Sequence, residues 1–258
     1  MTKISKKRLI NCDLGEGEPE PHTLELMRWI DCANIACGVH AGDATRLPYL
    51  IEAALRQKVS PGGHPGLPGN FGRADIDTMD SSGFAQLLLP QVKCFIDACK
   101  AVGCEMEAIH FKLHGSLYHL TENNVELAQS WLNLFDRLNL RPRLIVKAGG
   151  QLQSLALARG FAVWAEGFLD RAYQDDGSLM PRSHPNALIS NTADVLKRLQ
   201  LLLDEGQIET LCGNRLQMDA DTLCLHGDTP NALHILKAVR KQLEKGMVGR
   251  LGLEPRTN

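Results

Sequence analysis

The sequence has few aromatic residues and almost no excess of charge of either sign. Phenylalanine, tryptophan and tyrosine make up 5 % of the 258 residues, and the formal net charge at pH 7 is −2. Nucleic-acid-binding domains commonly gather lysine and arginine on one face or along one helix. Because this sequence has no such basic stripe, we do not expect nucleic acid to be its main partner.

Long apolar runs and closely paired cysteines are also absent from the sequence. The apolar stretch after Arg8 is broken at Asn11 and Asp13, which makes it too short for a signal peptide, and no later run reaches the roughly 20 apolar residues of a membrane-spanning helix. The eight cysteines include no C-x-x-C pair and lie mostly in apolar segments, where a free thiol behaves as a small buried hydrophobe. We therefore expect a cytoplasmic protein with reduced cysteines and no membrane contact.

Short apolar segments of strand length alternate with longer helical patterns along the chain. Strands are predicted at 8–14, 32–37, 59–63, 105–112, 143–147, 161–168 and 222–226, with a weaker candidate at 208–211. Helices are predicted at 23–30, 47–55, 81–102, 122–138, 193–204 and 231–245, with another that ends at 159. Pro90 is expected to kink or interrupt the third of these helices. Such alternation requires parallel strands joined by crossover helices.

Two architectures fit this order of elements: a closed barrel and an open doubly wound sheet. No G-x-G-x-x-G follows an early strand, so the best sequence sign of an open dinucleotide-binding sheet is missing. No shift in composition marks a linker, and no internal repeat or low-complexity segment is present. Residues 1–258 are therefore predicted to form a single α/β domain, with the barrel favoured.

Polar residues collect where the predicted strands end. The residues in these positions are Asp13, Glu16, His40, Asp43, His64, Lys112, His114, Glu166, Asp170, Arg171, His226 and Asp228. In a parallel barrel the carboxyl ends of the strands converge on one face, where the loops build the active site. Scattered surface charges would not line up in this way, so the positions favour an enzyme.

Some of these clusters indicate function more strongly than others. Small residues flank His40 and let backbone or ligand approach closely, and His64 lies between residues that fix the backbone. Lys112 and His114 are two positions apart, so on an extended strand both side chains face the same way. A cation there could hold a substrate carboxylate or an oxyanion, and an imidazole could carry a proton near neutral pH.

Each cluster also has a structural explanation. Asp13 could accept backbone N–H groups in a turn, Asp43 could cap a helix, and Asp170 with Arg171 could be a structural ion pair. Cys37 lies inside an apolar strand and is expected to be a buried thiol rather than a nucleophile. The remaining histidines look incidental: His22, His110, His119, His184 and His234.

The sequence leaves metal binding open. Three histidines and an aspartate that converge on one face could bind a divalent ion such as zinc, manganese or nickel. If a metal is present, the expected ligands are Asp13, His40 and His64. No H-x-H, H-E-x-x-H or C-x-x-C motif supports this reading, and spacing alone does not separate a metal site from a metal-free acid–base set.

A series of short motifs, spread from residue 11 to residue 228, resembles the family of 5-oxoprolinase A subunits, also called the LamB/YcsF family. The motifs are Asn11–Gly17, Ala33–Asp43, His64–Pro65, Phe71–Arg73, Lys112–Tyr118, Asp170–Tyr173, Asp176–Gly177, Pro181–Ser183 and Cys224–Asp228. The ANIACG-x-HAGD-type stretch at 33–43 is highly specific by itself. Three positions depart from the family's pattern: Gly69-Asn70 replaces a longer loop, Leu113 a proline, and Leu169 a small residue.

The resemblance implies an irregular, TIM-like, seven-stranded parallel β/α barrel, similar to those of glycoside hydrolases and polysaccharide deacetylases. It also implies ATP-dependent cleavage of a small cyclic amide, 5-oxoproline, to L-glutamate, carried out with separate B and C subunits. The chain has no G-x-x-x-x-G-K-[ST] loop, so ATP would be held in another way or largely by the partner subunits. Association of the chain with further copies of itself is left open.

The resemblance and the strand-end positions together give a set of expected site residues. The expected catalytic residues are Asp13, His40, His64, His114, His226 and Asp228, and the expected substrate contacts are Asn11, Glu16, Asn34, Asp43, Lys112, Asp170, Arg171 and Tyr173. The first three histidines would carry proton transfer and oxyanion stabilisation, with one of them oriented by Asp13 or Asp228. Lys112 or Arg171 would hold a carboxylate or phosphate. Asp13 and the four catalytic histidines are expected to open into one cleft.

Two other functions are compatible with the same residues. One is a metal-dependent carbohydrate deacetylase, which an aspartate and two histidines on this barrel would suit. The other is a non-catalytic subunit that binds a small molecule. Metal content would distinguish the deacetylase, and complementation of activity by partner chains would distinguish the binding subunit.

Overall fold

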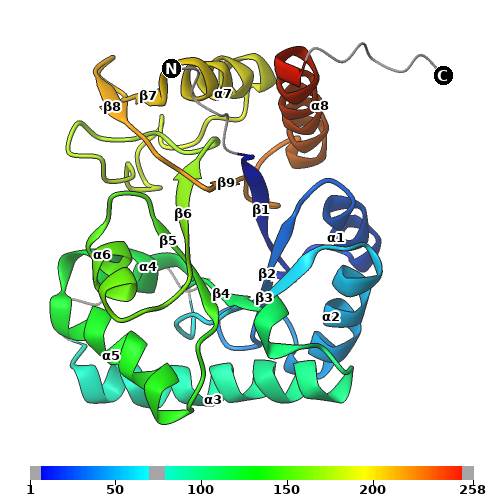
Figure 1. The fold of residues 1–258 in the computed structure, drawn as a ribbon, viewed down its shortest axis with the longest axis vertical. Helices are drawn as coiled ribbons and strands as arrows, with labels where there is room; N and C mark the ends of the chain where they lie inside the picture. Colours follow the sequence, from blue (N-terminus) through cyan, green and yellow to red (C-terminus); the bar gives the residue numbers. More distant parts are fainter. Residues whose placement is uncertain (1–6, 70–78, 252–258) are drawn as a thin grey trace.

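A computed structural model describes residues 7–69 and 79–251, the last six of them through their backbone alone. The motif residues 70–73 lie outside the described residues. In the described part of the chain, parallel strands alternate with helices around a closed barrel (Figure 1).

Seven parallel strands close the barrel, in the order β1-β2-β3-β4-β5-β6-β9. They are β1 (Leu9–Leu14), β2 (Cys32–Ala36), β3 (Ser60–His64), β4 (His110–Phe111), β5 (Arg143–Lys147), β6 (Val163–Phe168) and β9 (Thr222–Cys224). The ring closes because β9 pairs in parallel with both β6 and β1. The prediction of a seven-stranded parallel β/α barrel is confirmed.

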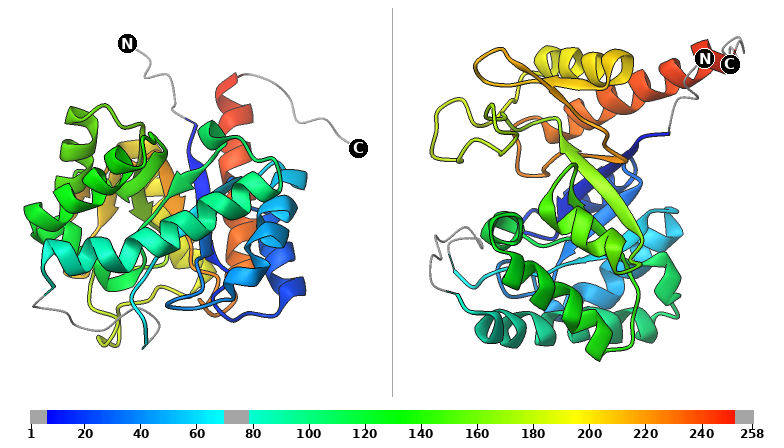
Figure 2. Two further views of the ribbon diagram at one scale, coloured as in Figure 1. Left: turned by 90° about the horizontal axis from the view of Figure 1, so that it is seen from below. Right: turned by 60° about the vertical axis from the view of Figure 1, so that its left-hand side comes forward.

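Helices surround the barrel and cover its outer face (Figures 1 and 2). They are α1 (Glu20–Met27), α2 (Leu47–Arg56), α3 (Ser81–Ala101), α4 (Gly115–Asn123), α5 (Val125–Arg137), α6 (Gln151–Ala158), α7 (Thr192–Glu205) and α8 (Ala232–Leu251), with short 3₁₀ turns η1 (Ala44–Arg46) and η3 (Met106–Ala108). Among residues 7–69 and 79–251, none of the helices combines the length and the apolar character needed to cross a bilayer.

Two predicted strands differ from the observed ones. The candidate at 208–211 corresponds to β7 (Gln207–Glu209), which pairs with β8 (Arg215–Gln217) in a separate antiparallel sheet and does not join the barrel. The strand predicted at 105–112 shortens to β4, because the 3₁₀ turn η3 occupies its first half. The barrel itself is unaffected by either difference.

Two predicted helices also differ. The helix predicted at 122–138 is split into α4 and α5, because the side chain of Asn124 accepts two backbone N–H groups and starts a new helix. Pro90 lies inside α3, which continues through it, so the expected interruption was wrong. The fully buried side chains Leu88, Val92 and Phe95 give α3 packing that offsets the roughly 3 kcal/mol cost of an interior proline.

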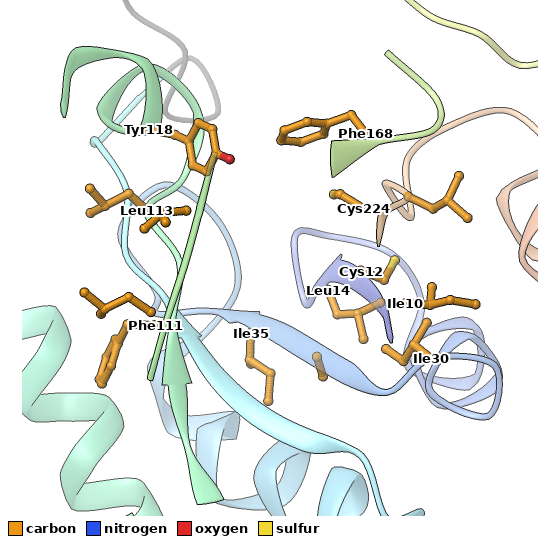
Figure 3. Close-up of a cluster of buried hydrophobic side chains, with 14 of the residues drawn as sticks. Ile10, Cys12, Leu14, Ile30, Ile35, Phe111, Leu113, Tyr118, Phe168 and Cys224 are labelled. Carbon is orange, nitrogen blue, oxygen red and sulfur yellow. The ribbon is translucent and has the colours of Figure 1, made fainter. Parts of the chain in front are cut away.

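Alternate residues of a strand point to opposite faces, and in this barrel the two faces differ in polarity. Ile10 and Cys12 of β1 belong to the buried apolar layer around the barrel (Figure 3). Asn11 and Asp13 alternate with them and turn inward, where Asn34 of β2 bonds to both. The barrel interior is therefore polar, unlike the branched apolar layers common in such barrels.

Candidate functional site

Amide side chains and a histidine form a hydrogen-bonded network inside the barrel. Asn34 Nδ2 donates to Asn11 Oδ1 at 2.8 Å and to Asp13 Oδ1 at 2.7 Å. Asn11 Nδ2 in turn donates to Thr222 Oγ1 at 2.9 Å. Asn11 and Asn34 were expected to contact substrate, but both side chains are completely buried. Their position makes them supports that hold Asp13 in one orientation.

His110, expected to be incidental, belongs to this network. Its Nε2 lies 2.8 Å from Asn34 Oδ1, and the ring fits because residue 62 is glycine: a Cβ there would lie 2.0 Å from Nε2. Burial, aided by the charges of Lys112 and His64, lowers the pKa of His110 to about 3, so the ring is neutral at pH 7. His110 precedes Lys112 by two positions, and residues two apart on a strand face the same side. This spacing could have predicted from the sequence that both side chains point into the barrel.

Lys112 is buried beside two carboxylates and a thiol. Its Nζ lies 2.9 Å from Asp13 Oδ1, 2.9 Å from Glu166 Oε1 and 3.2 Å from Cys224 Sγ. The contact with Asp13 is a hydrogen bond, whereas that with Glu166 is a charge pair without hydrogen-bond alignment. Burial opposes the charge, but Asp13 and the groups beside it raise the pKa of Lys112 well above its usual range. Glu166, outside the expected site set, is thus one of the two carboxylates beside Lys112.

Asp13 lies between Lys112 and two histidines, His64 and His226, which belong to different parts of the site. Its Oδ2 lies 3.3 Å from His64 Nε2 and 3.8 Å from His226 Nε2. Burial opposes ionisation, but His64 and Lys112 outweigh it and hold the pKa of Asp13 well below its usual range. Asp13 is therefore a carboxylate at neutral pH with cationic or imidazole groups on several sides.

The first group of histidines shares one carboxylate. Glu16, His40, His64 and His114, here called the His–Glu cluster, lie at the ends of β1 to β4. Glu16 Oε1 lies 3.0 Å from His40 Nε2 and 2.9 Å from His114 Nδ1. Burial lowers the pKa of His40 to about 4, despite the carboxylate of Glu16, so this ring is neutral at pH 7. The ligating atoms of the four residues all lie within 4.8 Å of one another, a grouping that could hold a metal ion.

The second group is a single histidine with its own carboxylate. His226 Nδ1 lies 3.0 Å from both oxygens of Asp170, which also accepts from the His226 backbone N–H and from Thr229 Oγ1, each at 2.8 Å. Because a carboxylate only accepts, Nδ1 carries the hydrogen and Nε2 is left facing Asp13. Asp170, expected to contact substrate, is completely buried and orients His226 instead.

Two acidic residues of the expected set lie at the surface. Asp43 is exposed, and its side chain accepts the backbone N–H of Thr45, which caps η1. Asp228 is half-exposed, and its Oδ2 lies 3.3 Å from Arg182 Nη1. Of the two aspartates expected to orient a histidine, Asp13 contacts His64, whereas Asp228 is placed beside Arg182.

Arg171 and Tyr173 are buried, and each makes a hydrogen bond to the backbone. Arg171 Nη2 donates to the carbonyl of Met180 at 2.7 Å, and the Tyr173 hydroxyl accepts the N–H of Phe168 at 2.8 Å. Tyr173 is only 1 % exposed. The expectation that Tyr173 contacts substrate is therefore not supported by its position, and Arg171 holds the loop that follows β6.

Two aromatic residues that the sequence interpretation left out lie close to Lys112. Tyr118 of α4 and Phe168 of β6 face each other, with ring centroids 5.8 Å apart (Figure 3). Lys112 Nζ lies 5.4 Å from the centroid of Phe168, whose ring also stacks on that of His226. Burial and the carboxylate of Glu166 raise the pKa of Tyr118 well above its usual range, so it stays a neutral phenol. Tyr118 is the last residue of the Lys112–Tyr118 motif, and this could have indicated from the sequence that it lies near the site.

Known proteins are similar in sequence to nearly the whole chain. The sequence matches the LamB/YcsF family over residues 9–254. It is 35 % identical over 239 residues to the 5-oxoprolinase A subunit of Tolumonas auensis, covering 91 % of this chain and 94 % of that one. Identity to the 5-oxoprolinase A subunit of Pyrococcus furiosus is 33 % over 242 residues, covering 92 % and 93 % of the two chains.

A solved structure is similar across the whole barrel. The lactam utilization protein from Thermus thermophilus superimposes with a TM-score of 0.80 at 29 % sequence identity, covering 98 % of this chain and 100 % of that one. The motifs, the barrel and the sequence match all extend over nearly the whole chain, so one family accounts for them together. The chain belongs to the LamB/YcsF family.

Proposed function

We propose that this chain is the A subunit of a 5-oxoprolinase, in which it opens the ring of 5-oxoproline to L-glutamate together with ATP and separate B and C subunits. The observation that carries the proposal is the convergence of Lys112, His64 and His226 on Asp13 at the carboxyl end of the barrel. The names of the relatives, which are 5-oxoprolinase A subunits and a lactam utilization protein, support a lactam as the substrate.

The reaction needs an activated carbonyl and a proton carrier. A five-membered lactam is a resonance-stabilised amide, so water attacks it slowly at neutral pH. Transfer of a phosphoryl group from ATP to the amide oxygen would make the ring carbonyl carbon a better electrophile. Water would then add to that carbon while a general base takes its proton, and the C–N bond would break as the ring nitrogen gains a proton, which leaves γ-glutamyl phosphate. A second water would hydrolyse this acyl phosphate to glutamate and phosphate.

His226 is the residue best suited to carry the proton. Asp170 fixes the hydrogen on Nδ1, so Nε2 can accept a proton from water and return it to the ring nitrogen. Lys112 supplies a fixed positive charge that would stabilise a developing oxyanion or hold the substrate carboxylate. Phe168 packs beside both groups and would limit the access of bulk water.

The division of labour between subunits follows from what the sequence lacks. Without a G-x-x-x-x-G-K-[ST] loop, this chain has no standard cradle for the phosphates of ATP. We therefore assign nucleotide binding largely to the partner subunits, and lactam binding and ring opening to this chain.

The test is 5-oxoproline-dependent ATP hydrolysis with glutamate formation as a second readout. The purified chain alone, the B and C subunits alone, and all three together are compared. Turnover is expected only in the complete mixture, with little or none from this chain alone. Robust glutamate formation by the isolated chain would contradict the division of labour. No turnover with partners that are active with another organism's A subunit would contradict the proposed function.

A further inference from the structure

The His–Glu cluster directs four ligating atoms toward one point from four different strand ends. Glu16 follows β1, His40 follows β2, His64 ends β3 and His114 follows β4. The four positions are distant in sequence, so the parallel barrel brings them together and no single loop could do so. Such convergence is typical of a ligand-binding centre built by the fold.

The distances between the ligating atoms fit a common metal ion. Glu16 Oε1 lies 2.9 Å from His114 Nδ1 and 3.7 Å from His64 Nε2, and the two histidine nitrogens lie 3.0 Å apart. Two ligands bound to zinc at about 2.0–2.2 Å with a tetrahedral angle lie about 3.3 Å from each other. The observed separations lie on both sides of that value.

Contacts behind the ligating atoms hold two of the rings in place. His64 Nδ1 lies 2.8 Å from the backbone carbonyl of Lys112, which can only accept, so in the neutral ring Nε2 carries a lone pair directed into the cluster. Metal-bound histidines commonly have such a partner on the other nitrogen. His40 Nδ1 has no hydrogen-bond partner among the described residues, and its ring is fixed by close packing on Gly66 and by a parallel stack on His114, with centroids 3.9 Å apart.

Without an ion, a proton on His64 is another way to offset the buried carboxylates beside the cluster. His64 Nε2 faces the carboxylates of Asp13 and Glu16, and burial opposes the charge on the ring, but the two carboxylates raise the pKa of His64. A protonated His64 is therefore the alternative to a metal ion at the same place. The two states differ in composition, so a measurement of bound metal separates them.

Three imidazole nitrogens and one carboxylate oxygen are the donors that zinc and its neighbours in the first transition row prefer, whereas magnesium and calcium prefer oxygen alone. We propose that Glu16, His40, His64 and His114 bind one divalent transition-metal ion, with zinc the best match. Compared with the expected ligands Asp13, His40 and His64, this set has Glu16 in place of Asp13, whose Oδ1 is held by Lys112, and adds His114.

The ion would lie next to the proposed lactam site. Asp13 Oδ2 contacts both His64 and His226, so Asp13 separates the ion from the proton carrier. An ion in this position acts as a Lewis acid on a carbonyl or phosphoryl oxygen. This role rests on the proposed function, whereas the binding of the ion does not.

The test is the metal content of the full-length chain. The protein is stripped with a chelator, dialysed against zinc chloride or magnesium chloride, and analysed by inductively coupled plasma mass spectrometry. One zinc per chain and no retained magnesium are expected. His114→Ala and Glu16→Gln should each weaken zinc binding by more than the roughly 10–100-fold cost of losing a supporting hydrogen bond. Cobalt in place of zinc should give the visible absorption of a four-coordinate site.

Matched variants make the result specific. His234→Ala removes a histidine of α8 outside the cluster and should leave zinc binding unchanged. Asp13→Asn should also retain zinc, and loss of zinc in this variant but not in Glu16→Gln would assign the ligand to Asp13 and contradict the proposed set. His40→Gln serves if His114→Ala fails to fold, as judged by thermal unfolding.

A wild-type chain that retains no zinc would overturn the proposal, and so would His114→Ala and His40→Gln variants that bind it with undiminished affinity. No substrate or partner subunit is used, so failure of the lactam assay would leave this outcome unaffected.

Discussion

The two sides of the barrel's carboxyl end use histidine differently. On the β1–β4 side, three rings crowd around one carboxylate, Glu16, and contact one another. On the β6–β9 side, the ring of His226 is oriented by Asp170. Rings that share one acceptor cannot all be charged, so they are suited to hold a cation jointly, whereas a ring with its own carboxylate has a fixed tautomer and can pass a proton. Whether a ring shares its carboxylate or has one of its own therefore decides whether it is suited to bind a cation or to transfer a proton.

Removal of His226 should have the largest effect and leave the other side intact. His226→Ala is expected to lower the rate of glutamate formation by the complete complex about 10²–10⁴-fold, because the proton carrier is lost. Zinc content should not change. Steady-state kinetics and metal analysis on the same preparation measure both.

Asp170→Asn tests the orientation of His226, since it keeps the size of the side chain but no longer fixes the hydrogen on Nδ1 of His226. It should also slow turnover strongly. A fully active His226→Ala variant would show that His226 takes no part in the reaction and would contradict the assignment of proton transfer to the β6–β9 side.

Lys112 connects the two sides, so its replacement should destabilise the whole barrel end. Lys112→Met leaves the carboxylates of Asp13 and Glu166 without their buried cation, which should cost about 3–5 kcal/mol in the free energy of unfolding. Urea denaturation measures this cost. Lys237→Met is the control: it removes a partly exposed pair with Glu25 at 3.2 Å and should cost under about 1 kcal/mol.

The neutral, buried ring of His110 should make stability fall in mild acid. Its pKa is about 3 in the folded chain, against about 6.5 when unfolded, so between these values only the unfolded state gains the proton. Stability is therefore present above pH 6.5 and should fall by about 1 kcal/mol per pH unit below it. His110→Gln should show a shallower loss between pH 6.5 and 5 in urea titrations. An equal slope in both proteins would show that His110 is not held neutral.

The smallest effect is expected at Asp43, which lies near the first side in sequence but contacts none of its four residues in the described structure. Asp43→Ala removes the cap of η1 and should cost about 1 kcal/mol of stability. Turnover and zinc content should not change. A large loss of turnover at unchanged stability would restore Asp43 as a substrate contact and would extend the site to the η1 loop.

The sequence predicts the strand-end residues well because strand order and chain direction alone decide them. His40, His64, His114 and His226 lie at the carboxyl ends of four different strands, which a parallel barrel brings to one common end. The seven barrel strands follow from the same alternation of segments. These features depend on the pattern of the chain and not on the detailed packing of side chains.

The barrel interior was harder to predict, because it depends on the register between neighbouring strands. Asp13 lies opposite Asn34 in the register of β1 and β2, and this pairing places the amide against the carboxylate. The sequence gives no register between two strands, so the approach of Glu166 to Lys112 was not predicted. For His110 the parity with Lys112 was available and was not used.

Loop residues were the least predictable group. The side chains of Tyr173 and Asp228 depend on how the loops after β6 and β9 fold, and no periodic pattern constrains them. Tyr173 is consequently found bonded to the backbone of Phe168, and Asp228 beside Arg182.

The hydrogen bond between Asn11 and Thr222 joins the first strand of the barrel to the last, so the site is complete only when the barrel has closed. These residues lie on the first and last strands of the barrel, 211 positions apart in the chain. Closing a loop of this length costs chain entropy before the contact is gained, which slows the pairing of such distant strands. Until β9 pairs with β1 and β6, both strands keep an open edge, and Asp13 lacks its neighbour His226. Barrel closure and completion of the charged centre therefore need the same strand, so a nascent chain that has not yet delivered β9 has neither.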